Sequence, residues 1–90
     1  MTTGITASGT FYSYNKIEGT TPIVFIHGVG LTNEIWEPQL DFFKKYSTIS
    51  YDILGHGKSN LEKKDISFDD FSDQLKDLID ELKINKIHLV

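Results

Sequence analysis

The chain has 90 residues, enough for one small domain with a thin core, because a chain of this size buries only about 60–65% of its unfolded surface. Hydrophobic residues make up 39% of the sequence and charged residues 24%, which is typical of a folded domain and excludes a disordered segment. The nine basic residues, all lysines, are scattered among thirteen acids at a net charge of −4, so no basic face is expected for nucleic acid or an anionic membrane.

The absence of cysteine excludes a disulfide framework, a thiolate zinc site and a cysteine nucleophile. The longest apolar run, residues 23–26, is far shorter than the roughly 18 residues that cross a bilayer. The first ten residues lack the basic start and apolar centre of a signal peptide. We therefore expect a cytoplasmic protein with no membrane partner.

Strand signals come first in chain order. The segment GTFYSYNKIEG mixes aromatic and β-branched residues between glycines, which predicts one or two short antiparallel edge strands within about residues 10–18. In TPIVFIHG, Pro22 can begin a strand but not occupy its middle, and the next four residues are apolar on both faces. This pattern predicts a central parallel strand over about residues 22–27, with helices on both sides.

A short helix and a second strand follow. Because proline is tolerated only at the start of a helix, Pro38 predicts a turn over residues 32–37 and a helix over about residues 38–45. A buried stripe is expected from three residues at spacings of four and three, namely Trp36, Leu40 and Phe43. The run STISYDIL predicts a strand over about residues 48–53, ending at the glycine turn GHGKS.

The clearest amphipathic helix is predicted over about residues 68–83. Its apolar residues recur at intervals of three and four, at Phe68, Phe71, Leu75, Leu78, Ile79 and Leu82. Ser67 and Asp70 resemble a capping box before this stripe. The β-branched run KIHLV predicts a last strand over about residues 86–90, where His88 is interpreted as a buried core histidine.

The order strand, helix, strand, helix, strand predicts right-handed crossovers and a parallel α/β sheet in a single unit over residues 1–90. A final strand that stops at Val90 leaves such a sheet without a covering helix on one face. We therefore expect this sequence to be the first part of a larger α/β domain.

The turn HGVG lies where a parallel sheet binds ligands, beyond the carboxyl end of a strand, and its glycines let a ligand approach the backbone. One chemistry that uses this arrangement is dinucleotide binding, since Gly28 and Gly30 follow a strand and Asp52 lies near the end of the next one. However, the third glycine of that fingerprint is replaced by Asn33, and Pro38 delays the helix that would receive the pyrophosphate. This interpretation is therefore disfavoured.

The other chemistry is an oxyanion hole, in which a backbone N–H stabilises the charge that develops on a carbonyl oxygen during acyl transfer, by about 3–4 kcal/mol per donor. The segments PIVFIHGVG and YDILGHGKS, in this order, resemble the α/β-hydrolase superfamily, whose third strand ends in HG and whose fourth runs into a DxxGxGxS turn. The resemblance covers about residues 9–90. It implies the N-terminal part of an α/β-hydrolase sheet, truncated before the nucleophile.

The resemblance also implies roles for single residues. The residue after HG in this family donates its main-chain N–H to the oxyanion, which implies that role for Val29, with His27, Gly28 and Gly30 supporting the loop. A structural role in the second turn is implied for Asp52, Gly55, Gly57 and Ser59. Trp36 is a candidate for the substrate pocket, although a tryptophan at this position is more often part of a core.

Members of this superfamily carry the nucleophile on a GxSxG elbow after the last predicted strand, and an acid and a histidine later. No GxSxG occurs in the 90 residues, and Ser59 does not fit an elbow serine. The resemblance implies a hydrolase of a small ester, thioester, lactone or related carbonyl compound, without a cofactor. Because the 90 residues lack the reactive groups, we expect them to be inactive alone, and a non-catalytic fragment or half-domain remains the alternative.

The remaining histidines carry no catalytic signal. His27 is expected to hold loop backbone by hydrogen bonds rather than to transfer protons. His56 is expected to be an exposed turn residue. No two histidines have ligand spacing with a carboxylate on a common face, so no metal site is predicted.

Overall fold

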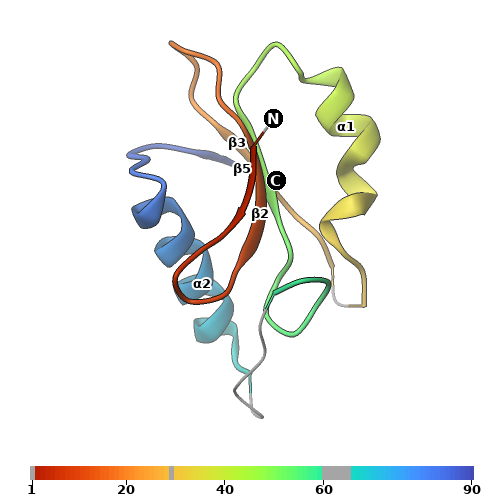
Figure 1. Cartoon of the computed structure of the whole chain (residues 1–90), viewed down its shortest axis with the longest axis vertical. Coiled ribbons are helices and arrows are strands. Elements are labelled where there is room, and N and C mark those ends of the chain that lie inside the picture. The colour runs from red at the N-terminus through yellow and green to blue at the C-terminus, as the bar shows by residue number, and fades with distance from the viewer. Residues whose placement is uncertain (1, 29, 60–65) are drawn as a thin grey trace.

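The computed structural model describes residues 2–28, 30–59 and 66–90, and these form a mixed sheet with helices on both faces (Figure 1). The strands are β1 (Thr2–Ile5), β2 (Phe11–Asn15), β3 (Ile23–Ile26), β4 (Thr48–Tyr51) and β5 (His88–Leu89). They lie in the order β1-β2-β4-β3-β5. In the described part of the chain, no helix is long and apolar enough to cross a membrane.

The central strands are parallel, as the element order predicts. β3 pairs in parallel with β4 on one side and with β5 on the other. Val24 and Phe25, adjacent in β3, point to opposite faces and are both buried, which explains why this strand is apolar throughout. The α/β fold predicted from the sequence is therefore confirmed, with β3 between two parallel neighbours.

The antiparallel part differs from the prediction. A strand within residues 10–18 is present as β2, but β2 lies between β1 and β4 and is not an edge. The edge is β1, which the sequence pattern missed because its residues are mostly polar. Gly4 faces Tyr12 across the ladder, and a Cβ at Gly4 would lie 2.7 Å from the Tyr12 hydroxyl oxygen. The ring of Tyr12 thus fills the space that a side chain at Gly4 would occupy.

The segment after β3 is helical earlier than predicted. Residues that were expected to turn form a 3₁₀ helix, η1 (Asn33–Trp36), which leads directly into α1 (Glu37–Phe42). The Thr32 hydroxyl accepts the Glu34 N–H at 3.4 Å and so caps this segment. Helix α1 ends at residue 42 rather than near residue 45. The ring of Phe43, which follows the helix, packs against Phe25 of β3.

Helix α2 (Phe68–Glu81) begins as predicted, with the capping box of Ser67 and Asp70 present in both directions. Phe68, the first residue of the predicted apolar stripe, is 90% exposed. Phe68 occupies the first helical position, and the apolar stripe of α2 contacts the core only from Phe71 onward. The stripe therefore begins one turn later than its spacing suggests.

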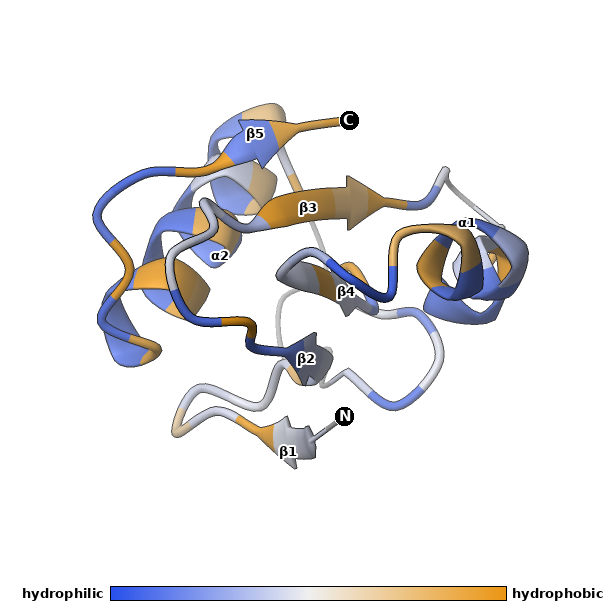
Figure 2. Cartoon of the chain, turned by 90° about the horizontal axis from the view of Figure 1, so that it is seen from above, coloured by the Kyte–Doolittle hydropathy of each residue, from blue (hydrophilic) through white to orange (hydrophobic). Residues whose placement is uncertain are grey.

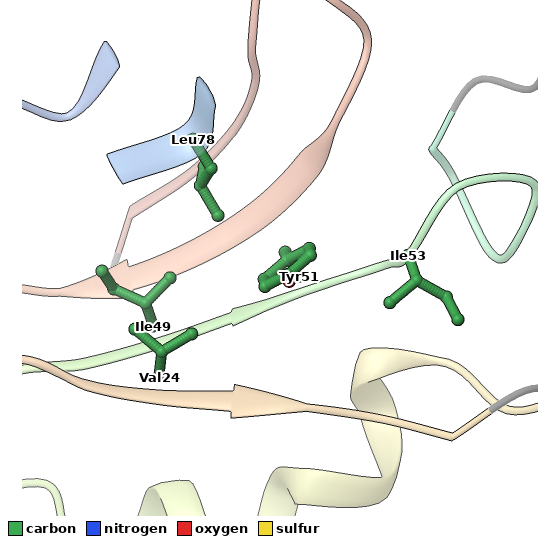
Figure 3. Close-up of a cluster of buried hydrophobic side chains, with 5 residues drawn as sticks. All are labelled: Val24, Ile49, Tyr51, Ile53 and Leu78. Atoms are coloured by element: carbon green, nitrogen blue, oxygen red, sulfur yellow. The ribbon is translucent and has the colours of Figure 1, made fainter. Parts of the chain in front are cut away.

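The core lies between α2 and the sheet, and Figure 2 shows α1 and α2 on opposite sides of the strands. Its buried residues come from β3, from β4 and its extension, and from α2; they are Val24, Ile49, Tyr51, Ile53 and Leu78 (Figure 3). The interpretation of His88 as a core residue is wrong. Within the described chain, β5 pairs with β3 alone and lies at the sheet edge, so His88 is exposed.

Candidate functional site

The two sequence motifs meet at one end of the sheet. The loop after β3 carries the residues of the HGVG segment, and the turn after β4 carries those of the GHGKS segment, so both lie at the carboxyl ends of parallel strands (Figure 1). Such ends are where parallel sheets bind ligands. The predicted oxyanion donor, Val29, lies outside the described residues, so its role stays a prediction.

His27 joins the two motifs from the β3 side. Its side chain is buried, the Ile53 N–H donates to its Nε2 at 3.0 Å, and its Nδ1 lies 2.8 Å from the Gly28 carbonyl oxygen. Because a backbone N–H only donates and a carbonyl only accepts, the ring must be neutral with its proton on Nδ1. Both nitrogens are thus committed to backbone groups, which is the loop-holding role that the sequence predicts.

His56 is not the exposed turn residue that the sequence suggests. It is half-buried, the Gly30 N–H donates to its Nε2 at 2.9 Å, and its Nδ1 lies 2.9 Å from the Leu54 carbonyl oxygen. The same argument assigns a neutral ring with the proton on Nδ1. The rings of His27 and His56 lie side by side, with centroids 5.5 Å apart. The prediction failed because a turn between glycines gives no sign that a second loop covers it.

The carboxylate of Asp52 accepts hydrogen bonds from both η1 and the turn after β4. Its side chain is 2% exposed; Oδ1 accepts the Asn33 N–H at 2.8 Å and the Asn33 side-chain amide at 2.7 Å, and Oδ2 accepts the Lys58 N–H at 2.9 Å. Burial by itself raises the pKa of this carboxyl, but these hydrogen bonds from Lys58 and Asn33 hold the pKa below its ordinary value. Asp52 is therefore a buried carboxylate that ties η1 to the turn.

This geometry argues against a dinucleotide site. A ribose-binding acid must present its oxygens to the ligand, whereas both oxygens of Asp52 are engaged by the chain itself. Asn33, which stands where the fingerprint has its third glycine, is one of the residues that engage them. The acid that matches the fingerprint and the asparagine that breaks it are thus used for a structural contact with each other.

The other residues of the second motif have structural contacts as well. Gly55 and Gly57 adopt positive φ angles of 74° and 50°. The Ser59 hydroxyl donates to the Asp52 carbonyl at 2.5 Å and accepts the Phe11 N–H at 3.0 Å, so its oxygen links the turn to β2. Ser59 is buried, and within the described chain its hydroxyl has no hydrogen bond to a histidine side chain, which does not fit a nucleophile.

Gly57 leads to a stability prediction. A Cβ at this position would overlap the Asp52 carboxylate, in addition to the strain of its positive φ. We expect Gly57→Ala to lower the free energy of unfolding by about 2–3 kcal/mol. Gly19→Ala is the matched control, because Gly19 also has a positive φ, 80°, but no atom lies within 4 Å of its Cβ position. It should cost about 1 kcal/mol. Urea denaturation measures both, and equal losses would contradict the overlap.

Sequence reasoning missed Gln74, which holds the turn from the opposite side. Gln74 is buried in α2; its Nε2 donates to the Asp52 carbonyl at 3.0 Å, and its Oε1 accepts the Leu54 N–H at 3.0 Å. Its Nε2 also donates to the Thr10 hydroxyl at 3.1 Å. The available signal was its position, three residues after Phe71 and four before Leu78, where a polar residue interrupts the apolar stripe.

Trp36 lies away from this cluster. Its ring packs against Phe25 with centroids 5.1 Å apart, on the α1 side of the sheet. It is absent from the lining of the apolar hollow described next, and a pocket role for Trp36 stays a prediction.

An apolar hollow of about 340 Å³ opens beside the loop, between the strand ends and the first turns of α2. Its lining consists of Ile26, His27, Gly28, Tyr51, Ile53, Phe68, Phe71, Ser72, Leu75 and Leu89. Burial raises the pKa of Tyr51 to about 12, so its hydroxyl stays neutral. Across the described residues, no three histidine, aspartate or glutamate side chains are grouped to hold a metal ion. The hollow therefore offers apolar contact next to a glycine loop.

The comparisons with known proteins agree with this geometry. A model of the alpha/beta hydrolase fold family matches residues 21–90. The chain is 38% identical to an (E)-2-((N-methylformamido)methylene)succinate hydrolase and 31% identical to 3-oxoadipate enol-lactonase 1, both of Acinetobacter baylyi; the alignments cover 89% and 82% of this chain. A bromoperoxidase structure from Bacillus anthracis superposes with a TM-score of 0.80 at 29% identity, over 89% of this chain. The chain spans 30%, 28% and 29% of these three proteins.

Proposed function

The chain belongs to the α/β-hydrolase family, and from this premise we propose that the full-length protein hydrolyses a small ester, thioester, lactone or related carbonyl compound. The observation that carries the proposal is the loop after β3. The loop is tied to the segment after β4 by two imidazole–backbone hydrogen bonds, from the Gly30 N–H to His56 and from the Ile53 N–H to His27, at the carboxyl ends of parallel strands. A loop fixed in this way can present a backbone N–H without rearrangement when charge develops on a substrate oxygen.

The apolar hollow supports the substrate class. It adjoins His27 and Gly28, so a substrate whose carbonyl reached the loop would place its remaining atoms against Ile26, Ile53 and Phe71. Among the described residues, no lysine side chain lines the hollow, and its histidine uses both ring nitrogens for backbone groups. This environment favours a compact, largely apolar acyl group over an anionic one. The similarity to an enol-lactonase favours lactones within the class.

In the proposed mechanism, a serine hydroxyl attacks the carbonyl carbon while a histidine base takes its proton. The Val29 N–H and one further amide stabilise the oxyanion of the tetrahedral intermediate. Collapse of the intermediate expels the alcohol or thiol, which receives the proton, and water then hydrolyses the acyl-serine by the same steps in reverse order. The serine, its base and the acid are placed outside these 90 residues, since the sequence contains no GxSxG.

The proposal is tested by assaying the full-length protein with p-nitrophenyl acetate, p-nitrophenyl butyrate and a small γ-lactone. We expect turnover that stops after reaction with a fluorophosphonate, because this reagent captures an activated serine. Peptide mapping should place the label on a GxSxG serine. Turnover that continues after complete labelling, or the absence of both turnover and labelling, would refute the proposal.

A further inference from the structure

His56 and His27 connect the same two loops in opposite directions. His27 stands on the loop after β3 and accepts a backbone N–H from the turn, that of Ile53, at 3.0 Å. His56 stands on the turn and accepts a backbone N–H from the loop, that of Gly30, at 2.9 Å. Each ring also holds its Nδ1–H against a carbonyl oxygen, so neither imidazole is free to rotate.

From this reciprocal arrangement we infer that His56 is a positioning residue, which sets the conformation of the glycine loop and thereby the direction of its oxyanion donor. The inference deepens the proposed function and rests on it. His56 is not itself assigned contact with the substrate. It acts through the Gly30 N–H, and no other member of the second motif has a described hydrogen bond to this glycine.

The loop needs such a contact because packing does not hold it. Gly30 is exposed and has a φ of +87°, and apart from its neighbours in sequence no atom of the described residues lies within 4 Å of the place where its Cβ would be. A glycine in open space has wide conformational freedom, and a single hydrogen bond at 2.9 Å removes much of it. Loss of that bond would therefore release the loop without disturbing the core.

The same bond also selects which amide remains for the substrate. The Gly30 N–H is occupied by His56, while the Gly28 carbonyl accepts both the Leu31 N–H at 3.1 Å and the His27 ring. The residues on both sides of position 29 in the sequence are thus anchored, one by each histidine. We expect these two anchors to preorganise the N–H donor assigned to position 29, as oxyanion stabilisation requires.

The two histidines differ in burial, so their substitutions test different properties. His27 is 3% exposed and packs at the end of β3, so its replacement would alter the fold as well as the loop. His56 is only half-buried, so its replacement can test the loop alone. Glutamine can place Oε1 near the position of Nε2 and still accept the Gly30 N–H, whereas leucine has similar bulk and no acceptor.

The experiment compares His56→Leu and His56→Gln in the full-length protein, with p-nitrophenyl acetate as substrate. We expect His56→Leu to lower kcat about tenfold or more with KM changed less than twofold, because the donor is misdirected while the hollow is intact. His56→Gln should recover most of kcat. An effect of the fold alone would not be rescued by restoring one acceptor oxygen.

Nuclear magnetic resonance supplies a second readout that is independent of turnover. An N–H···N hydrogen bond transmits a scalar coupling between its two nitrogens, so the wild-type protein should show one between Gly30 N and His56 Nε2. The coupling between Ile53 N and His27 Nε2 is the internal control for an intact sheet end. In His56→Leu, the Gly30 amide should exchange with solvent faster while the Ile53 coupling persists.

The outcomes distinguish the two proposals. A missing Gly30–His56 coupling in the wild type, or wild-type kcat in His56→Leu, would overturn the positioning role. If the wild type shows neither turnover of the esters and the lactone nor fluorophosphonate labelling, the proposed function fails. Retention of the coupling, with faster Gly30 exchange in the leucine variant, would then still support His56 as the residue that sets the loop.

Discussion

Val29→Pro is expected to lower kcat of the full-length protein about 10²–10³-fold toward p-nitrophenyl esters. Proline has no backbone N–H, so this substitution removes the donor that the motif resemblance assigns to position 29. A donor that acts on the developing oxyanion stabilises the transition state more than the bound ester. The loss should therefore fall on kcat, with KM changed much less.

Val29→Ala is the matched control, because it removes the branched side chain and keeps the N–H. It should retain most of kcat, and both variants should unfold at urea concentrations close to that of the wild type. Proline also restricts the residue before it, here Gly28, and the Ile53–His27 coupling checks that the neighbouring strand ends remain in place. Equal activity of the proline and alanine variants would remove Val29 from the oxyanion hole.

The central sheet could be predicted because its signals are local and strong. A proline followed by four apolar residues predicts β3, and regular spacing together with a capping box predicts α2. The elements that were missed depend on partners distant in the sequence. β1 is stabilised by the ring of Tyr12 against Gly4, and η1 by the carboxylate of Asp52, and neither contact is written in the local pattern.

The candidate site was likewise predicted only where its signals are local. The glycines and Asp52 were identified from their motifs, because a turn requires particular residue types at fixed offsets. His56 and Gln74 were not, since their function is to satisfy backbone groups of other segments, Gly30 and Leu54 respectively. A buried polar contact of this kind is determined by which loops meet, and that is known only after the chain has folded.

These contacts form a connected network beneath the loop. Asp52 joins η1 to the turn through its carboxylate and receives Gln74 and Ser59 at its carbonyl. Its Oδ1 also lies 4.0 Å from Nε2 of His27, the ring that fixes Ile53. Because most of these links end on a backbone group, the loop's shape depends on polar satisfaction more than on apolar packing.

Asp52→Ala is therefore expected to lower the free energy of unfolding by about 3–5 kcal/mol. The substitution leaves three part-buried donors without their acceptor, the N–H groups of Asn33 and Lys58 and the side-chain amide of Asn33. Each unsatisfied donor costs about 1–3 kcal/mol, and the sum is reduced where water can enter. Urea denaturation followed by circular dichroism measures the loss. Asp52→Asn should lie between alanine and wild type, because an amide oxygen still accepts one donor while its NH₂ opposes another.

Asp41→Ala is the control for charge, since it removes an exposed acid from α1 and should change stability by less than about 0.5 kcal/mol.

The pH dependence of stability provides a further test. Because the folded-state pKa of Asp52 is lowered, its contribution is complete above the unfolded-state pKa and is lost as pH falls through the folded-state pKa. The stability difference between wild type and Asp52→Ala should thus shrink as pH decreases below about 5. A difference that stays constant across this range would mean that the three donors do not bind the carboxylate in its ionised form.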